Sequence, residues 1–149
     1  MHFMPKLPDL DSMENCVCFN LRKFSRVFTQ FYAGAISRHA LLPTQTPILY
    51  ALASHPDAGM AELSEALGMD RTTLVRNLRP LERDGLVKMS GKGSGGKVAL
   101  SITAGGKKAL AEVQADWHKA QQAVVESLGE ERWRAILRDL EKAASALSH

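Results

Sequence analysis

The stretch SGKGSGGKVALSIT, residues 90–103, raises the question of nucleotide chemistry. Gly91 is followed, after four residues, by Gly96 and Lys97, which is most of the phosphate-binding pattern G-x-x-x-x-G-K-[ST]. In that pattern the residue after the lysine supplies a hydroxyl to Mg²⁺, but here it is Val98. The pattern must also open a helix, whereas VALSI alternates and carries β-branched residues, which is typical of a strand. Two requirements of a nucleotide site are therefore missing.

Basic residues are concentrated around this stretch. The chain of 149 residues carries a net charge of only +3, yet residues 71–97 hold seven basic side chains against Glu82 and Asp84. The seven are Arg71, Arg76, Arg79, Arg83, Lys88, Lys92 and Lys97. Such clustering is expected of a face that binds nucleic acid, although charge alone fits a solvated surface equally well.

The composition, 45% hydrophobic and 23% charged, is that of a soluble globular protein. No apolar run approaches the ~18 residues of a membrane span, and the N-terminus lacks the apolar core of a signal peptide. Cys16 and Cys18 are too few and too close for a disulfide framework, which favours a reducing compartment. We therefore expect a cytoplasmic protein without membrane contact. The histidines show no metal-ligand spacing and no catalytic triad can be argued, so we expect no metal, no cofactor and no enzyme activity.

Hydrophobic periodicity predicts a mostly helical chain with one small hairpin, after a loose arm at residues 1–12. Glycines at 68, 85 and 129 are expected to end helices, and Asp70 and Thr103 to cap the N-termini of two others. The expected helices begin at Ser12 and Pro43 and cover 60–67, 71–84, 104–128 and 130–147, and the expected strands cover 86–90 and 97–102.

The helix from Arg71 has two opposite faces. At ~100° per residue, Leu74, Leu78 and Leu81 form one narrow apolar stripe. The opposite stripe carries Thr72, Arg76, Arg79 and Arg83, with Thr73 beside it. Arginine suits guanine edges and phosphates because its fork is planar and bidentate. A short helix, a glycine turn and this second helix indicate a helix-turn-helix. The two strands and their basic glycine loop then indicate a wing, in which Lys92 and Lys97 contact phosphate.

Pro80 stands inside this predicted helix. A proline there removes the hydrogen bond to the Arg76 carbonyl and costs about 3 kcal/mol. Two outcomes follow from the sequence: a local kink that tertiary packing maintains, or a break in the helix.

The stretches MAELSEALGMDRTTLVRNLRPLERDGLVK and VALSITAGGKKAL, with the helices that flank them, resemble the MarR family of winged-helix transcriptional regulators. The resemblance extends from about Met13 to Leu147, and ERDGLV together with the junction ITAGG is its most specific part. It implies a homodimer built from N- and C-terminal helices, with one recognition helix per subunit in the major groove and one wing along the minor groove. It also implies a ligand or oxidant sensor that releases DNA. Position by position, it implies DNA contacts for Arg71, Thr72, Thr73, Arg76 and Asn77.

The wing departs from the family pattern. The family's wing carries Asp-x-Arg nine to seven residues before the junction threonine, where this chain has Ser94 and Gly96. Lys92 or Lys97 would have to replace the missing arginine, which changes the expected strength and specificity of the wing contact but not the expected fold.

Cys18 has two explanations. Free cysteine often packs as a small hydrophobic residue, and Cys18 lies on the apolar stripe of the first helix. The stretch MENCVCFNL also resembles the organic-hydroperoxide-sensing branch of the family, which has a reactive cysteine followed by phenylalanine at this place. In that comparison Tyr32 matches a tyrosine that hydrogen-bonds the cysteine, and Arg22, one turn after Cys18, would favour a thiolate. That branch has a tyrosine where Arg22 stands.

The predicted fold class is mostly α with a small β-wing, a winged helix-turn-helix with N- and C-terminal dimerisation helices. We predict one domain over 1–149, with dimerisation helices at 13–37 and 104–147 and a DNA-binding lobe at 44–103. The predicted function is that of a homodimeric repressor that binds a palindromic operator in double-stranded DNA and is released by a small aromatic effector or by cysteine oxidation. The alternatives are an architectural DNA-binding protein without effector and a nucleotide-binding enzyme that uses loop 91–97.

Overall fold

The computed structural model describes residues 9–91 and 98–148. Its elements are a 3₁₀ turn at Met13–Asn15, helices α1 (Val17–Ala35), α2 (Thr46–Ser54), α3 (Met60–Leu67) and α4 (Arg71–Arg83), strands β1 (Val87–Ser90) and β2 (Ala99–Ile102), and helices α5 (Ala104–Leu128) and α6 (Glu130–Leu147). This mostly helical chain with one antiparallel pair of strands confirms the predicted fold class. Most of the predicted loose arm, and Lys92, Ser94, Gly96 and Lys97 of the predicted wing tip, lie outside the described residues.

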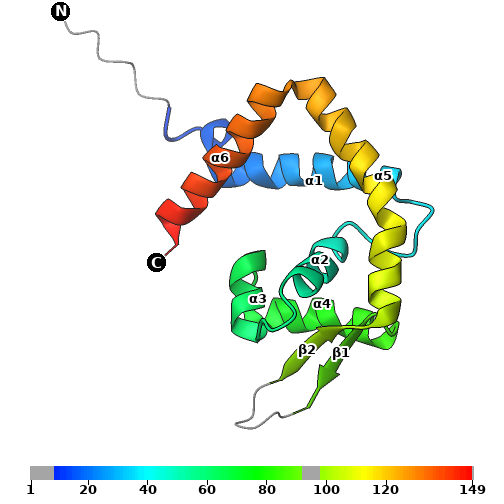
Figure 1. Cartoon of the computed structure of the whole chain (residues 1–149). Helices are drawn as coiled ribbons and strands as arrows, with labels where there is room; N and C mark the ends of the chain where they lie inside the picture. Colours follow the sequence, from blue (N-terminus) through cyan, green and yellow to red (C-terminus); the bar gives the residue numbers. More distant parts are fainter. Residues whose placement is uncertain (1–8, 92–97, 149) are drawn as a thin grey trace, which may run out of the picture.

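Helix α5 connects two parts of the molecule (Figure 1). Helix α2 and strand β2 pack against its N-terminal half, with α3, α4 and β1 grouped beside them, while α1 and α6 pack against its C-terminal half. Within the part of the chain that the structure describes, no helix combines the length and hydrophobicity that crossing a bilayer requires.

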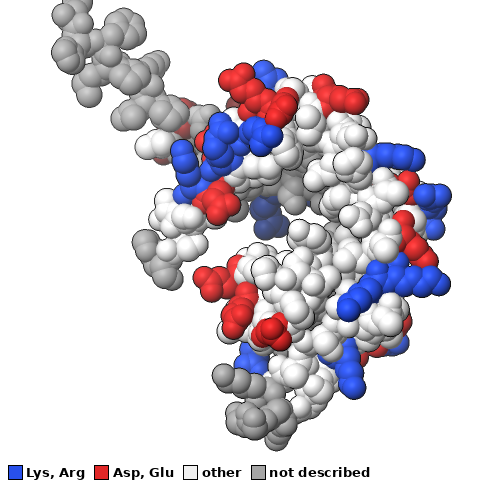
Figure 2. Space-filling model, viewed as in Figure 1, with Lys and Arg blue, Asp and Glu red and all other residues white. Residues whose placement is uncertain are grey.

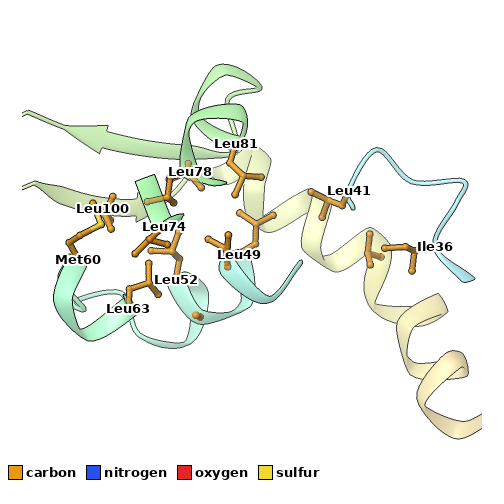
Figure 3. Packing of buried hydrophobic residues seen from close by; sticks show 14 residues of the cluster. Ile36, Leu41, Leu49, Leu52, Met60, Leu63, Leu74, Leu78, Leu81 and Leu100 are labelled. Atoms are coloured by element: carbon orange, nitrogen blue, oxygen red, sulfur yellow. The ribbon is translucent and has the colours of Figure 1, made fainter. Parts of the chain in front are cut away.

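The core lies under α4. Its predicted apolar stripe, Leu74, Leu78 and Leu81, is completely buried. Figure 3 shows these side chains directed toward Leu49 and Leu52 of α2, which are equally inaccessible. Full burial of a leucine side chain contributes roughly 1.5–3 kcal/mol, so this stripe fixes α4 to the core and leaves its opposite face free.

The end of α4 is closed by a glycine turn. Gly85 has a φ of 74°, a left-handed conformation that glycine adopts without steric cost. Its N–H donates to the Glu82 carbonyl at 3.0 Å, and the N–H of Leu86 donates to the Leu81 carbonyl at 2.9 Å. This is the Schellman arrangement of a helix C-terminus. The chain then enters β1, which pairs with β2 in a register that places Val87 opposite Ile102.

The predicted N-cap of α5, Thr103, is confirmed, and its side chain also bonds to the backbone that follows α4. The Thr103 hydroxyl accepts the Gly106 N–H at 3.0 Å and donates to the Gly85 carbonyl at 2.6 Å. Gly106 is buried, and a Cβ at this position would overlap the carbonyl oxygen of Leu86 and stand 2.7 Å from Ile102 Cγ1. The start of α5 therefore approaches the backbone that follows α4 as closely as a glycine allows.

Two predicted helix starts are corrected. The first helix begins at Val17 rather than Ser12, because Cys16 is extended (φ −76°, ψ 119°) and acts as N-cap, its Sγ accepting the Phe19 N–H at 3.5 Å. The second begins at Thr46 rather than Pro43, because residues 43–45 form a turn that precedes it.

Pro80 does not break α4. The helix is continuous from Arg71 to Arg83, and the Pro80 carbonyl accepts the Asp84 N–H at 3.0 Å. The observed strands are shorter than predicted. Pairing begins at Val87, so Leu86 lies outside β1, and Val98 lies outside β2, which begins at Ala99, while Lys97 lies outside the described residues.

Candidate nucleic-acid interface

The exposed face of α4 forms a shallow groove. Arg71, Thr72, Arg76 and Arg79 are exposed, as the predicted polar stripe requires. Together with Val75 they line an open groove of about 390 Å³. The structure thus brings four of the predicted DNA-binding residues together on one surface.

The N-terminus of α4 is held by Asp70. One carboxylate oxygen accepts the Thr73 N–H at 2.7 Å and the other accepts the Thr73 hydroxyl at 3.1 Å. The backbone hydrogen bond from Thr73, followed by that of its hydroxyl, lowers the pKa of the Asp70 carboxyl. Because the Thr73 hydroxyl proton is directed to Asp70, this predicted DNA-binding residue is left to offer its oxygen lone pairs as acceptors.

Asn77 is not among the groove-lining residues. Its side-chain NH₂ donates to the Thr73 carbonyl at 2.9 Å and contacts Met69 Sδ at 4.0 Å, and the residue is half-buried. An amide whose NH₂ group is directed to Thr73 and Met69 cannot form the bidentate pair with adenine that asparagine makes in other interfaces. In this conformation Asn77 offers DNA only its carbonyl oxygen.

Val75 is a groove residue that sequence reasoning missed. It is half-buried, at the border between the leucine stripe and the arginine stripe. Its position, ~100° around the helix from Leu74, was the available signal. The pattern alone does not single it out, because an apolar residue next to a buried stripe is usually attributed to the core.

Charges around the helix-turn-helix favour approach from the α4 side. Figure 2 shows acidic side chains gathered over α3, where Glu62 and Glu65 are exposed. Lys88 on β1 is exposed as well, and Arg83 pairs with Asp84 at 3.4 Å. A phosphate backbone is repelled by the surface of α3 and attracted by that of α4 and β1.

The candidate sensor residues are spread along α1. Cys18 and Arg22 are exposed near the helix start. Tyr32 lies 14 residues after Cys18, which at ~1.5 Å per residue places it about 21 Å farther along the axis. The two side chains therefore cannot meet within one chain, and contact between them requires two subunits.

Tyr32 instead contacts α5. Its hydroxyl donates to Gln121 Oε1, and its ring stacks on Trp117 with centroids 4.5 Å apart. Burial raises the pKa of the Tyr32 hydroxyl. Sequence reasoning did not find this cluster, because its partners are some 90 residues apart.

A second polar link joins the segment after α1 to α5. Arg38 Nε lies 2.6 Å and His39 Nε2 lies 2.8 Å from the same carboxylate oxygen of Asp116. These two hydrogen bonds, that of Arg38 first, lower the pKa of the Asp116 carboxyl. In the described ranges, 9–91 and 98–148, no group of three or more His, Cys, Asp or Glu residues could hold a metal ion.

A large pocket of about 1040 Å³ lies between α2 and α5. Its walls are mostly apolar and include two aromatic residues, Tyr50 from α2 and Trp117 from α5, with His118 and Gln121 as polar members. Trp117 and Gln121 line this pocket and also contact Tyr32. Trp117 and Gln121 thus link the pocket to the end of α1.

The outer faces of α1 and α6 are apolar and uncovered in the single chain. No residue of either helix is buried. The large exposed side chains include Phe24, Phe28, Ile136, Leu137 and Leu140. Contiguous apolar surface of this kind marks an interaction site.

Comparison with known proteins gives matches over most of the chain. A family model described as MarR family matches residues 41–93. The M. tuberculosis transcriptional regulator MosR is 33% identical, with 91% of this chain and 99% of that chain covered and a TM-score of 0.76. The same regulator in complex with DNA gives 32% identity, 90% and 99% coverage and a TM-score of 0.78. The S. aureus MepR–DNA complex is 22% identical, with 92% and 100% coverage and a TM-score of 0.73. No curated protein matches the chain.

Proposed function

Since the chain belongs to the MarR family of winged-helix transcriptional regulators, we propose that it is a homodimeric repressor that binds a palindromic operator and is released by an effector. The observation that carries the DNA-binding part is the two-sided construction of α4. Three fully buried leucines anchor one face, and Arg71, Thr72, Arg76 and Arg79 line a groove on the other. The similar regulator MosR has been crystallised with DNA.

Dimerisation supports this proposal through the apolar faces of α1 and α6. A partner that covers Phe24, Phe28 and Leu140 removes these side chains from water. A second copy of the chain can do so with the same apolar surface, in a symmetric interface. The symmetric dimer then presents two α4 helices to one face of the duplex. Half-sites one helical turn apart, about 34–36 Å, are the geometry that such a pair reads, which is why we propose a palindrome.

The proposed domain organisation separates the DNA-binding residues from the dimerisation helices. We propose a single domain, with residues 44–103 as the DNA-binding lobe and the segments 13–37 and 104–147 as the dimerisation helices. Helix α5 belongs to both parts, because Val113 is buried in the core of the lobe whereas its later residues contact α1 and α6. A change at the dimer helices can therefore reposition α4.

The pocket between α2 and α5 is the proposed effector site. Its apolar walls and the rings of Tyr50 and Trp117 suit a small aromatic molecule. Occupation of the pocket would act on Gln121 and Trp117, which hold Tyr32 at the end of α1. Movement of α1 relative to the lobe would change the spacing of the two α4 helices and so weaken operator binding.

Cysteine oxidation is the second proposed route of release. Cys18 is exposed in the first turn of α1, and Cys16 caps the same helix through its sulfur. Oxidation of either side chain would alter the start of a dimerisation helix. Arg22, one turn on, is exposed as well. Tyr32 of the partner would complete the site.

The structure argues against the nucleotide-binding alternative. Val98 packs against the hydrophobic core, and the residues that follow form β2 rather than a helix. Neither a hydroxyl for Mg²⁺ nor a helix N-terminus for phosphates stands after loop 91–97, so we propose no enzyme activity. An architectural protein without sequence preference would not need the groove on α4.

Selection from a random-sequence duplex pool tests the proposed function. The wild-type protein should enrich one inverted repeat, and fluorescence anisotropy on that duplex should show binding that is at least ~10³-fold tighter than on unrelated DNA. Equal affinity for all sequences would instead support the architectural alternative. ATP binding without DNA binding would support the enzyme.

A further inference from the structure

The groove on α4 contains one apolar side chain among polar ones. Arg71, Thr72, Arg76 and Arg79 offer charge or hydrogen bonds, and Val75 offers only methyl groups. The leucine stripe beside it is completely buried, whereas Val75 remains partly accessible. The exposed part of Val75 therefore faces whatever fills the groove.

The spacing along α4 places Val75 at the centre of a row. Arg71 precedes it by four residues and Arg79 follows it by four, so the three side chains lie on adjacent turns of one helix face. The arginines are long and reach outward, while valine is short and has one strongly preferred rotamer in a helix. A base edge opposite Val75 must therefore come close to the helix and meets a rigid apolar surface.

One apolar group exists on the base edges of the major groove. It is the methyl group at C5 of thymine, where cytosine carries only a hydrogen atom, and the groups that distinguish the other base edges are hydrogen-bond donors and acceptors. A polar base edge opposite Val75 would lose water without gaining a partner, which is costly. The chemistry of the groove thus favours a 5-methylpyrimidine at this place.

We propose that Val75 contacts the 5-methyl group of one thymine in each half-site and makes the protein select thymine there. The inference rests on the proposed function, because it requires α4 to lie in the major groove. A 5-methylcytosine carries the same methyl group, so the test must separate recognition of the methyl group from recognition of the thymine hydrogen-bonding edge.

The test uses the duplex that the wild-type dimer selects. Each thymine is replaced in turn by deoxyuridine, which lacks only the methyl group. At one position per half-site, wild-type affinity should fall about fourfold, the factor that corresponds to burial of one methyl-sized group. Cytosine against 5-methylcytosine at the same position should show a gain of similar size from the methyl group.

Val75→Ser removes both methyl groups of the side chain and has a helix propensity close to that of valine. It should bind the thymine and deoxyuridine duplexes equally at the position where the wild type distinguishes them. Val125→Ser, on α5 and also half-buried, is the matched control and should keep the wild-type ratio. The ratio is measured within each variant, so differences in stability cancel.

Retention of the full wild-type ratio by Val75→Ser at every thymine would overturn the proposal. A lower wild-type affinity for the 5-methylcytosine duplex than for the cytosine duplex at that position would also overturn the proposal. If Val75→Ser does not fold, a nuclear Overhauser contact between the labelled Val75 methyl groups and a thymine methyl group of the selected duplex decides the matter, and its absence counts against the proposal. A pool from which no sequence is enriched would overturn the proposed function itself, and this inference with it.

Discussion

The Thr103 hydroxyl donates a 2.6 Å hydrogen bond to the carbonyl of Gly85, a residue 18 positions earlier. The same oxygen accepts the Gly106 N–H, so one side chain ties the end of the recognition helix to the start of α5. The lobe that carries α4 and the helix that leads to the dimer interface are thereby joined at one junction.

Gly106→Ala should destabilise this junction. The added Cβ overlaps the Leu86 carbonyl, and overpacking of this kind costs about 1–3 kcal/mol. Gly105→Ala is the matched control, because its Cβ would lie 3.4 Å from the Gly85 carbonyl, an ordinary contact, and alanine in a helix stabilises by ~0.4–1 kcal/mol. Urea unfolding of both variants measures the difference, and equal stabilities would contradict the assigned close approach.

Arg76→Ala should weaken operator binding by about 1–3 kcal/mol and relax specificity at one position per half-site, if its guanidinium pairs with a base. Lys92→Ala, in the glycine loop, should weaken binding to all DNA alike and reduce the slope of log K against log salt. The measurement is anisotropy on the selected and on unrelated duplexes over a range of salt. An equal loss of Arg76→Ala on both duplexes would make Arg76 a phosphate contact.

Asp116→Asn should reduce the loss in free energy of unfolding that the protein shows as the pH falls. The folded state holds the pKa of Asp116 below its ordinary value of ~3.9, so its contribution to stability is complete above that value. The contribution is lost as pH falls through the lower folded pKa. Urea unfolding from pH 6 downward should therefore show a smaller drop in the variant. Asp70→Asn should also reduce the loss of unfolding free energy at low pH, independently of Asp116, because the pKa of Asp70 is lowered too.

Leu140→Glu should convert the dimer to a monomer. In the proposed dimer the second subunit covers this exposed apolar face of α6, so a carboxylate there would lose its hydration without gaining a hydrogen-bond partner. We expect the dimer interface to exceed the ~1,600 Å² class. Sedimentation equilibrium at micromolar concentration should show the wild type as a dimer and the variant as a monomer, and circular dichroism should show unchanged helix content. A monomeric wild type would refute the assembly.

Peroxide should lower operator affinity if Cys18 is a sensor. Its thiol would oxidise to a sulfenic acid. Cys18→Ser should abolish the response and keep basal binding. Cys16→Ser shows whether Cys16 contributes to the response, since a serine hydroxyl preserves the N-cap of α1. Unchanged DNA binding after peroxide treatment of the wild type would leave Cys18 as a packing residue.

The features of this chain that depend on local interactions could be predicted from the sequence. The two faces of α4 follow from the 3.6-residue period. The caps at Asp70 and Thr103 and the glycine turn at Gly85 depend on hydrogen bonds within a few residues. Even so, the start of α1 was misplaced, because Cys16 ends the helical geometry through its own extended conformation.

Contacts between residues far apart in the chain could not be predicted in this way, because they depend on how the helices pack. Tyr32 with Gln121, and His39 with Asp116, are separated by 89 and 77 residues, and no periodicity connects them. The same holds for Gly106, whose missing Cβ has meaning only because the Leu86 carbonyl lies against it. Val75 packs against the core on one side and lines the groove on the other, because the way α4 packs leaves this residue at the edge of its buried face. Such contacts arise from how whole elements pack, and a pattern along the chain carries no distance between them.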